Sequence, residues 1–540
     1  MRTLTERLAL TLIVLISAAA LSLVSFAAAP VKAPGGKVTD AASFIAALGG
    51  DEAAYIGDDG KTIIFLSDIE IYDIIDIVSG EYIVSGTGCY MTRAEGREIC
   101  PIFEVSGGHL TLGSEKGSND HPSLTLDGEG REGLGPLIAV DGGQLDIYIG
   151  TLLCGNRGSV GAIHSQGGET NVYAAKITDC GSASSSGGAA YVEENGNISF
   201  YGGDYQNNTA GAGGFAYVKG GTLTAVSAVI AYDTAAMGGA IFNDGGTVVL
   251  SEIPMQYCTS TTRAGAIYNT GDLTVSGGYI AYSDSPDTAA LWNTGKCVIS
   301  GSEITMCTAT NYCAVYNTGS IHQISTDVNN NTSEETCAVY NSGEYVLTEG
   351  SVSSNTAKVR FGGIINDGTF TVDSGSISSN KSKGDCQYGL AMVNRGKVIL
   401  RDNAFLSFNN DVLMVFGYGQ TDPRVEVENE LTANTPIITL TPAVSDPSRP
   451  DGFRLDFGTK KQLVFGKLDE CSKLTATDHI ADEYIIGDDG RLKWDGFADN
   501  DEGKGRVVLI VGVCVIAAAA VGGTVAATVI RAGRKKKKAE

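Results

Sequence analysis

A short phrase of alternating apolar and polar residues recurs along the chain and ends each time in an asparagine-containing turn. It reads GAIYNTGD at 265–272, CAVYNTGS at 313–320 and CAVYNSGE at 337–344. The asparagine lies two residues before the turn glycine, and successive copies are 24 to 28 residues apart. A fixed period of this length indicates repeats that each pack on the next. The repeated asparagines are Asn243, Asn269, Asn293, Asn317, Asn341, Asn366 and Asn394.

The pattern inside each copy predicts strands. An apolar strand leads to the asparagine turn, a second alternating strand such as DLTVSG (272–277) follows, and a third β-prone piece such as GYIAYS (278–283) precedes a polar link. Helical repeats would need long runs with a 3.6-residue period, and the sequence has none. We therefore predict an all-β protein, a right-handed parallel β-helix whose coils stack at ~4.8 Å.

The two ends of the repeat region differ from its middle. Asp40 is a suitable helix N-cap for an apolar stripe at Phe44, Ile45 and Leu48, which predicts a helix that covers the first coil. We place this cap and the first coils at 38–100 and the repeats at 101–410. A small β region at 411–495 is expected to close the far end, and 496–506 reads as a polar stalk.

Two apolar segments predict export and membrane anchoring. Residues 1–27 have the basic start, apolar stretch and small-residue end of a signal peptide, although an uncleaved anchor has the same pattern. Residues 507–530 form an uncharged run long enough to span a bilayer, and the basic tail at 531–540 should stay in the cytoplasm. A buried core helix is the alternative for this run. We expect a single-pass cell-surface protein with an extracellular ectodomain.

Stacked coils would turn each repeated position into a column. Alternation places the asparagines and aliphatic residues such as Ile241 inside, where each amide can bond to the coils above and below. The residue between them is usually aromatic and is expected outside, with the alanines two residues earlier leaving the ring faces open. Three interpretations stay open: a strip that binds glycans or a partner surface, rings that only pack on one another, or a reversed inside and outside. The predicted outward ladder consists of Tyr191, Tyr217, Phe242, Tyr268, Trp292, Tyr316 and Tyr340.

The cysteines and acidic residues give few chemical signals. Cys313 and Cys337 share one column in adjacent coils, within disulfide reach, and Cys89 with Cys100 is a weaker pairing. The cysteine spacings do not indicate zinc, and we expect neither a metal nor a cofactor. No catalytic motif appears, and Asp204, Asp233 and Asp287 do not share a column, so surface acids explain them better than catalysis does.

The composition and net charge of the chain limit the classes of molecule that it can bind. Only 19% of residues are charged, glycine accounts for 71 residues, and the formal net charge is −24. Such an acidic chain is a poor candidate for binding nucleic acid.

The phrases GGAIFN (238–243), GAIYN (265–269) and GGFAYV (213–218) resemble the repeats of polymorphic-membrane-protein-type adhesins and of other right-handed parallel β-helix cell-surface proteins. The resemblance covers about residues 38–495, and its ends are similar to those of surface proteins from Gram-positive anaerobes. The family's FxxN motif is missing apart from a loose match at 205–208. The resemblance implies adhesion or surface interaction with a glycan or a partner protein. A surface polysaccharide lyase or glycoside hydrolase, and a passive coat or spacer, are the alternatives.

Overall fold

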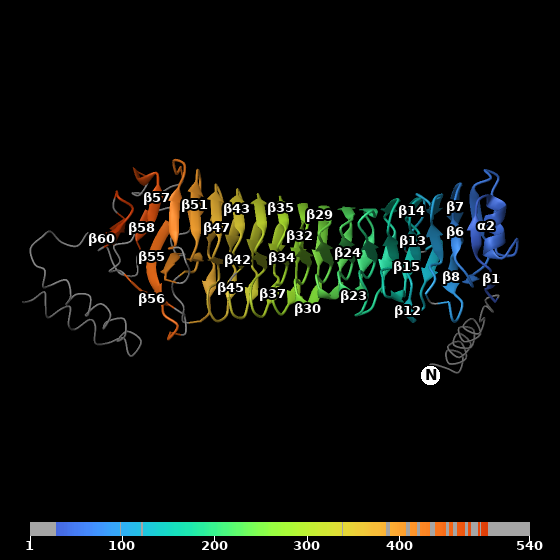
Figure 1. Cartoon of the computed structure of the whole chain (residues 1–540), viewed down its shortest axis with the longest axis horizontal. Coiled ribbons are helices and arrows are strands. Elements are labelled where there is room, and N and C mark those ends of the chain that lie inside the picture. The colour runs from blue at the N-terminus through green and yellow to red at the C-terminus, as the bar shows by residue number, and fades with distance from the viewer. Residues whose placement is uncertain are drawn as a thin grey trace, which may run out of the picture. The chain divides into compact units, whose positions relative to one another are not determined.

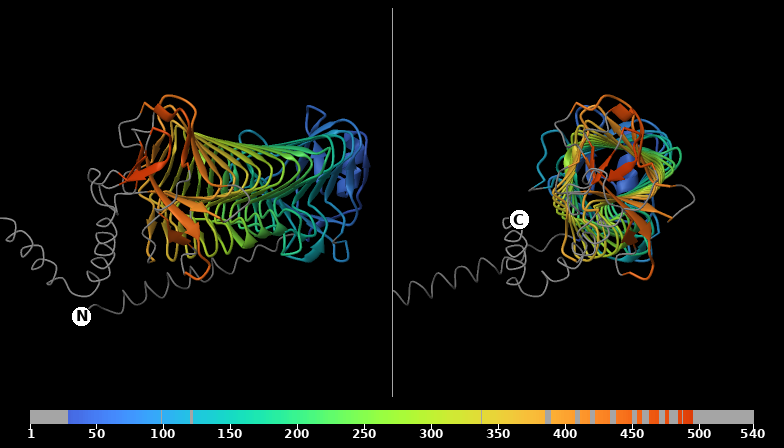
Figure 2. Two further views of the ribbon diagram at one scale, coloured as in Figure 1. Left: turned by 60° about the vertical axis from the view of Figure 1, so that its left-hand side comes forward. Right: turned by 90° about the vertical axis from the view of Figure 1, so that its left-hand side faces the viewer.

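The computed structural model divides the chain into two compact units, residues 1–321 and 322–540, which we describe separately. Both are built from parallel strands stacked coil on coil (Figures 1 and 2), and their described residues hold about 14 turns of parallel β-solenoid with almost no helix. The described residues are 29–97, 99–119, 122–336, 338–384, 389–406, 411–417, 422–432, 438–449, 453–456, 462–469, 474–476, 484–486 and 488–494.

Several predicted segments lie outside these residues: the signal peptide at 1–27, the stalk at 496–506, the membrane span at 507–530 and the tail at 531–540. Within the described part of the chain, no helix combines the length and apolarity that crossing a bilayer requires.

Three sheets form the walls of unit 1. Sheet B holds the apolar strand of each repeat, and sheet A holds both strands that follow the asparagine turn. The polar link of each repeat forms a third, shorter sheet D from residue 209 onward. Sheet B consists of β2 (Gly36–Val38), β6 (Ile75–Ile77), β9 (Phe103–Val105), β13 (Ile138–Val140), β17 (Ile163–Ser165), β20 (Ala190–Val192), β24 (Ala216–Lys219), β28 (Ile241–Asp244), β31 (Ile267–Asn269), β34 (Leu291–Asn293) and β38 (Val315–Asn317).

Sheet A carries two strand positions per coil, and sheet D carries one. Sheet A consists of β1 (Val31–Ala33), β3 (Ala54–Ile56), β4 (Thr62–Phe65), β5 (Ile69–Ile71), β7 (Glu81–Ser85), β8 (Cys89–Arg93), β10 (His109–Leu112), β11 (Leu124–Asp127), β14 (Gln144–Tyr148), β15 (Thr151–Cys154), β18 (Glu169–Tyr173), β19 (Lys176–Thr178), β21 (Asn197–Tyr201), β22 (Asp204–Gln206), β25 (Thr222–Val226), β26 (Val229–Ala231), β29 (Thr247–Gln256), β32 (Asp272–Ala281), β35 (Lys296–Ser300) and β36 (Glu303–Thr305). Sheet D consists of β23 (Thr209–Ala212), β27 (Thr234–Met237), β30 (Thr259–Arg263), β33 (Asp284–Ser285) and β37 (Thr308–Ala309).

The register of the stacked strands matches the repeat in the sequence. Ile267 pairs with Leu291 and Asn269 with Asn293, so that equivalent positions of successive coils lie on top of one another. Side chains alternate between the interior and the surface: Leu273 is 2% exposed, whereas the neighbouring Thr274 is exposed. The aliphatic positions of all coils therefore merge into one continuous core in this unit.

The N-terminal segment forms the predicted helix, α2 (Ala41–Leu48). Asp40 and Ser43 make a reciprocal capping box, and Gly49 ends the helix in the left-handed conformation at φ 108°. Phe44 is fully buried, and its ring packs edge-on at 5.3 Å from that of Tyr82. The hydrophobic stripe thus anchors the helix on the first coils of unit 1.

Unit 2 repeats the same three strand positions. Its strands in sheet A are β39 (Ser320–Ile324), whose first two residues belong to unit 1, and β40 (Asp327–Asn329), β43 (Glu344–Thr348), β44 (Ser351–Ser353), β47 (Thr369–Asp373), β48 (Ser376–Ser378), β51 (Lys397–Arg401), β52 (Phe405–Leu406), β54 (Arg424–Val427) and β57 (Val464–Gly466). Those in sheet B are β42 (Val339–Asn341), β46 (Ile364–Asn366), β50 (Met392–Asn394), β53 (Val412–Phe416), β55 (Ile438–Ser445), β56 (Phe453–Leu455) and β58 (Leu474–Ala476). Sheet D contributes β41 (Thr332–Ser333), β45 (Thr356–Ala357) and β49 (Lys381–Ser382), and β59 (Tyr484–Ile486) pairs with β60 (Leu492–Trp494).

The stacked repeats do not stop at residue 410, where the sequence pattern placed their end. Asn394 pairs in parallel with Met414, and Val398, Val425 and Val464 continue one column of sheet A. Antiparallel pairing in the described part of unit 2 appears with β56 and in β59–β60. The boundary was misplaced because these last coils keep the buried aliphatic positions but lose the asparagine turn by which we recognised a repeat.

A second column of buried polar groups lies at the corner between sheets A and D. In unit 2 the amide of Asn355 donates to Oδ1 of Asn380 at 3.0 Å and to the Val328 carbonyl at 2.9 Å. In unit 1 the same column contains Asn208 and Asp233, and Oδ1 of Asp233 accepts from both the backbone and the side chain of Asn208. The loose FxxN match at 205–208 therefore marks an inward corner asparagine.

Asp233 brings a carboxyl group instead of an amide to this column. Our interpretation of Asp233 as a surface acid was wrong, because its side chain is fully buried. Its Oδ2 has no hydrogen-bond partner among the described residues. Burial raises the pKa of Asp233 well above its ordinary value, so the carboxyl group is held neutral.

Replacing Asp233 with asparagine should stabilise the protein increasingly as the pH rises. Because this pKa is raised, the contribution of Asp233 to the free energy of unfolding is complete below about pH 3.9. That contribution is lost as the pH climbs toward the folded-state pKa. An asparagine side chain at this position cannot ionise, and its amide would face the Tyr205 carbonyl as Asn355 faces that of Val328. Urea unfolding at pH 4.5 and 7.5 should show a stability gain for D233N that is larger at pH 7.5 and exceeds about 1 kcal/mol there.

The matched control is Asp284→Asn, because Asp284 is exposed. A gain that is equal at both pH values, or equal in the control, would contradict a buried neutral carboxyl group.

Candidate functional site

The aromatic column of unit 1 lies on the outer face of sheet B. Ile241 and Asn243 are fully buried on either side of the half-buried Phe242, so the predicted inside and outside are not reversed. The ring centroids of Phe242 and Tyr268 are 4.8 Å apart and their planes differ by 13°. Trp292 follows at 6.0 Å from Tyr268, and Tyr316 at 3.9 Å from Trp292, both nearly parallel.

The rings at the start of the column are less regular. Tyr191 lies 5.3 Å from Tyr217 with a tilt of 31°, and Tyr217 meets Phe242 edge to face at 5.1 Å. His164 of the preceding coil stacks on Tyr191 at 4.9 Å, which extends the column by one ring that the sequence analysis left out. Tyr340, the last predicted member, belongs to unit 2, where its hydroxyl donates to Oδ2 of Asp367 at 2.9 Å.

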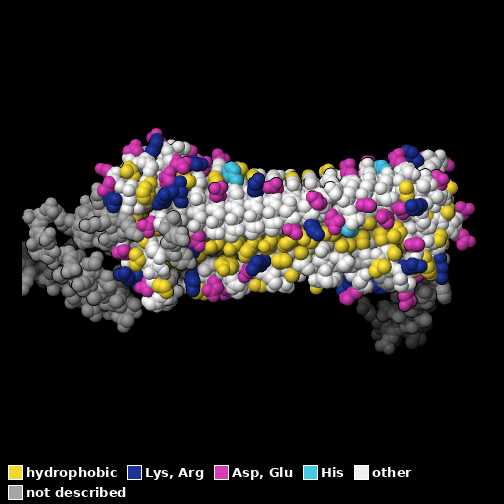
Figure 3. Space-filling model, in the orientation of Figure 1, with side chains coloured by type: hydrophobic (Ala, Val, Ile, Leu, Met, Phe, Trp, Pro, Cys, Tyr) yellow, Lys and Arg dark blue, Asp and Glu magenta, His cyan; other side chains and the backbone are white. Residues whose placement is uncertain are grey.

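Stacking covers the ring faces. Tyr191 and Trp292 are only 7% and 8% exposed, and the neighbouring rings are half-buried. The rings from Phe242 to Tyr316 stack on one another coil by coil, so our expectation of open ring faces was wrong. What reaches the surface is the row of ring edges, and Figure 3 shows hydrophobic side chains gathered in a band along this part of the molecule.

Charged groups border the band. The guanidinium of Arg263 lies 4.8 Å from the Trp292 ring centroid, a cation–π distance, and its Nε is 3.4 Å from Oδ2 of Asp287. The Tyr217 hydroxyl donates to Oδ2 of Asp244 at 2.9 Å. Burial raises the pKa of Tyr191 to about 12, so its hydroxyl stays neutral at physiological pH. The band therefore offers neutral ring edges with a cation at one place.

The repeated asparagines form a continuous inner ladder beneath these rings. The amide nitrogen of Asn243 donates to Oδ1 of Asn269 at 2.7 Å, Asn269 donates to Asn293 at 2.7 Å, and Asn293 donates to Asn317 at 2.8 Å. Each amide also donates to backbone carbonyls of the adjoining turns, such as Gly295 and Ser320 for Asn293. In unit 2 the members Asn341, Asn366 and Asn394 are joined in the same way.

The proposed disulfide between Cys313 and Cys337 involves a residue outside the described part, because Cys337 is not among the described residues. Cys313 is buried, and its sulfur lies 2.8 Å from the Val315 carbonyl oxygen. Cys89 and Cys100 are not joined to each other, so that weaker pairing was wrong. Burial raises the pKa of the Cys307 thiol to about 12, which makes it a poor nucleophile.

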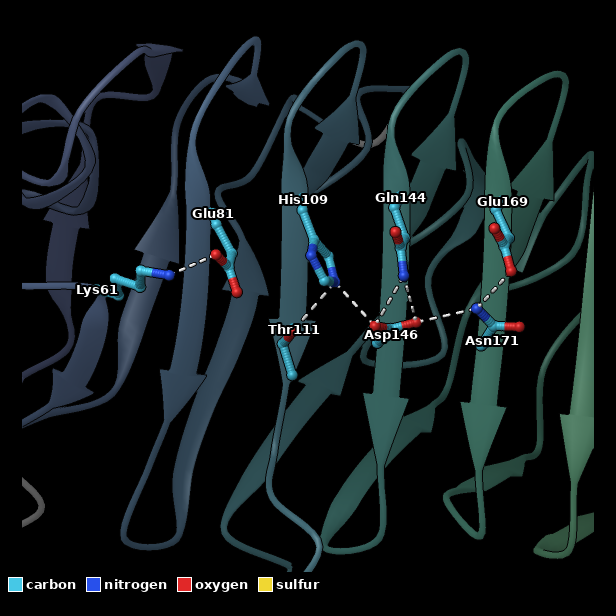
Figure 4. A network of polar contacts seen from close by, with 8 residues as sticks. All are labelled: Lys61, Glu81, His109, Thr111, Gln144, Asp146, Glu169 and Asn171. Carbon is cyan, nitrogen blue, oxygen red and sulfur yellow. Dashed lines mark hydrogen bonds and ion pairs between the residues drawn. The ribbon is translucent and has the colours of Figure 1, made fainter. Parts of the chain in front are cut away.

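The structure brings together a polar network that sequence reasoning missed, on the outer face of sheet A (Figure 4). Nε2 of His109 lies 2.8 Å from Oδ2 of Asp146. The amide of Asn171 donates at 3.1 Å to Oδ1 of Asp146 and at 3.1 Å to Oε1 of Glu169. Gln144 donates to the same aspartate from the same strand, at 3.1 Å. Alternation in β10, β14 and β18 turns all these side chains outward, above a core that includes the fully buried Leu110.

This network has the groups that proton transfer requires. With Asp146 ionised, Nε2 of His109 carries the hydrogen, and Nδ1 has no hydrogen-bond partner among the described residues. Asp146 and Glu169 each lie 3.1 Å from one amide nitrogen, so their bonded oxygens are at most 6.2 Å apart. The sequence signal for this site was the shared column of His109, Gln144 and Glu169, one residue after the turn.

Two further tyrosine stacks also escaped the sequence analysis. Tyr148, Tyr173 and Tyr201 stack at 4.7 and 5.3 Å beside the polar network. A second stack, at 5.0 and 4.8 Å, occupies the corner between sheets A and D, where its members have left-handed backbones and are 41–51% exposed. The sequence signal for this corner stack was the 25-residue spacing of its tyrosines. The members of this corner stack are Tyr232, Tyr257 and Tyr282.

Valine substitutions in the asparagine ladder should show energetic coupling only between adjacent coils. Valine occupies this column at Val218, so N269V and N293V introduce a side chain that the position accepts. Because Asn269 donates to Asn293, a double-mutant cycle by urea unfolding should give a coupling energy of about 1 kcal/mol.

The control pair is Asn243 and Asn317, which are three coils apart and share no hydrogen-bond partner in the ladder. The changes in the free energy of unfolding caused by its two valine substitutions should add within about 0.5 kcal/mol. Equal coupling in both pairs would mean that the amides do not act through the contacts described.

The chain was compared with family models, with curated proteins and with solved structures. No family model, no curated protein and no solved structure matches it.

Proposed function

We propose that the protein is a surface-interaction protein of the adhesin type, which binds another macromolecular surface through the aromatic band of unit 1. One observation carries the proposal: successive coils place rings from Tyr191 to Tyr316 in one outward column whose edges reach the surface. A row of apolar ring edges that runs along one face of a protein is typical of a contact site.

The orientation of the rings favours one kind of partner. A pyranose is bound by stacking on an aromatic face, but the faces here are occupied by neighbouring rings at 3.9 to 6.0 Å. Ring edges carry the positive end of the aromatic quadrupole and suit carbonyl and carboxylate oxygens. Arg263 adds a cation beside Trp292. These features favour a polypeptide surface over a glycan for the band.

We propose further that the ectodomain is displayed at the cell surface, exported by residues 1–27 and anchored by residues 507–530 with the basic tail at 531–540. The apolar pattern and flanking charges of these segments support this location. We propose that the coil is right-handed and that α2 caps its first turn, since an uncovered parallel edge would recruit other strands.

Arrays of extracellular proteins and of glycans, probed with the full-length chain, test the binding proposal. We expect binding to at least one arrayed protein, and Tyr316→Ala and Trp292→Ala should each weaken it by about tenfold or more, as central aromatic anchors do. Thermal melts of each variant separate lost binding from lost folding, because Trp292 is nearly buried.

The control is Val298→Ala, an exposed apolar residue of sheet A outside the band. The band is not the binding surface if both aromatic variants bind like the wild type, or if Val298→Ala weakens binding equally.

A second function is supported by the network of Figure 4. We propose that His109, oriented by Asp146, and Glu169, two coils away in the same column, give the protein general acid–base activity toward an extracellular glycan. Stacked tyrosines next to the network provide an apolar neighbour for a sugar chain.

This second function predicts release of reducing ends or unsaturated products from a panel of neutral and acidic polysaccharides. His109→Ala should abolish the release and Asp146→Asn should reduce it about 100-fold or more, because the neutral amide no longer fixes the imidazole. His322→Ala, which removes a histidine outside the network, is the control. Absence of products with the wild type would remove this function.

A further inference from the structure

We infer that unit 2 carries a separate binding groove for an uncharged saccharide, on the outer face of sheet A between β40 and β52. The groove is a hollow of about 510 Å³. That volume lies within the range of small-ligand sites and suits one or two sugar rings. It is independent of the aromatic band, which lies on sheet B.

The hollow arises from small side chains in two successive coils. The register places Asp327, Ser351, Ser376 and Phe405 in one column of sheet A. Serines at the two central positions leave a space about two coils wide, or roughly 10 Å at the spacing of β-strands. Larger side chains occupy this column in the last coils of unit 1, where Tyr279 is followed by Glu303.

One end of the groove is an aromatic wall. Phe405 is 37% exposed, and its neighbour in the column is Ser376 instead of another ring. It makes no ring–ring contact with any described residue, unlike Tyr345 and Phe370 in the same unit, which stack on each other at 4.7 Å. Phe405 therefore lines the groove with a ring that no other ring covers, and an uncovered aromatic ring is a surface on which the apolar side of a sugar ring stacks.

The floor and the opposite end are polar. The Ser376 hydroxyl and the Asn403 amide make no side-chain hydrogen bond to any described residue, so both can bond to sugar hydroxyls. Asp327 and Glu349 each use one carboxylate oxygen, toward Ser351 at 2.7 Å and Ser325 at 3.3 Å. Their remaining oxygens accept hydrogen bonds from hydroxyl groups, whereas their charges repel a uronic acid.

The chemical groups that line the groove therefore determine which class of ligand it can bind. A stacking face, free hydroxyl and amide groups, and two carboxylates together fit a ligand with many hydroxyl groups and no acidic group. Phosphorylated, sulfated and uronic sugars are disfavoured, and neutral hexose and N-acetylhexosamine oligomers are favoured.

The test uses the full-length chain on an array with two arms, neutral oligosaccharides of hexoses and N-acetylhexosamines, and oligouronates. The wild type should bind at least one neutral oligosaccharide and no oligouronate. Phe405→Ala should weaken that binding about tenfold or more by removing the stacking face. Ser376→Phe should abolish it, because a ring in this column fills the hollow.

Ser378→Phe is the matched control, with the same substitution two residues along β48 and outside the groove. It should bind within about twofold of the wild type, and thermal melts should show that all variants fold. The inference is overturned if no neutral oligosaccharide binds, if oligouronates bind instead, or if Ser376→Phe binds like Ser378→Phe. Tyr316→Ala should leave saccharide binding unchanged, which separates this groove from the aromatic band.

Discussion

Backbone hydrogen bonding between successive coils is the constraint on which both units depend, and along the asparagine column its register repeats every 24 to 28 residues. Each strand of the asparagine column pairs in parallel with its counterpart in the next coil, as Asn269 does with Asn293. Once that register is fixed, every side chain has an equivalent neighbour above and below at ~4.8 Å. Identity of sequence between coils then follows from packing, since a side chain that fits one coil fits the next.

The same constraint decides how polar groups can be buried. An isolated buried amide would be costly, but a column of asparagines satisfies each amide through its neighbours. The inner ladder from Asn243 to Asn317 follows this rule, as does the corner column in unit 2. Asp233 departs from it because a carboxyl group can accept from Asn208 but leaves Oδ2 without a described partner.

On the outer faces, stacking both creates surfaces and limits what they can bind. Where rings follow one another, as on sheet B, the faces are used up internally and the surface offers edges. Where a ring is followed by serine, as at Phe405 and Ser376, no other ring covers it and a hollow forms. Where polar residues follow one another, as at His109, Gln144 and Glu169, hydrogen-bond networks cross the strands (Figure 4). One fold thus supports a band of ring edges, a groove and a polar network by changing the sequence of a column.

The sequence by itself determined the repeat, the parallel stacking, the buried asparagines and the outward aromatic column, because each depends on period and alternation along the chain. The helix at Ala41–Leu48 was also readable, from its capping residues and apolar stripe. Only the tertiary structure decided that the ring faces are covered, that the coils continue past residue 410, and that His109 meets Asp146. The covered ring faces and the contact of His109 with Asp146 depend on which side chains of neighbouring columns touch. The later coils escaped notice because they keep their buried positions after losing the repeated turn phrase. Contacts between columns have no fixed spacing in the sequence, and so no pattern along the chain could reveal them.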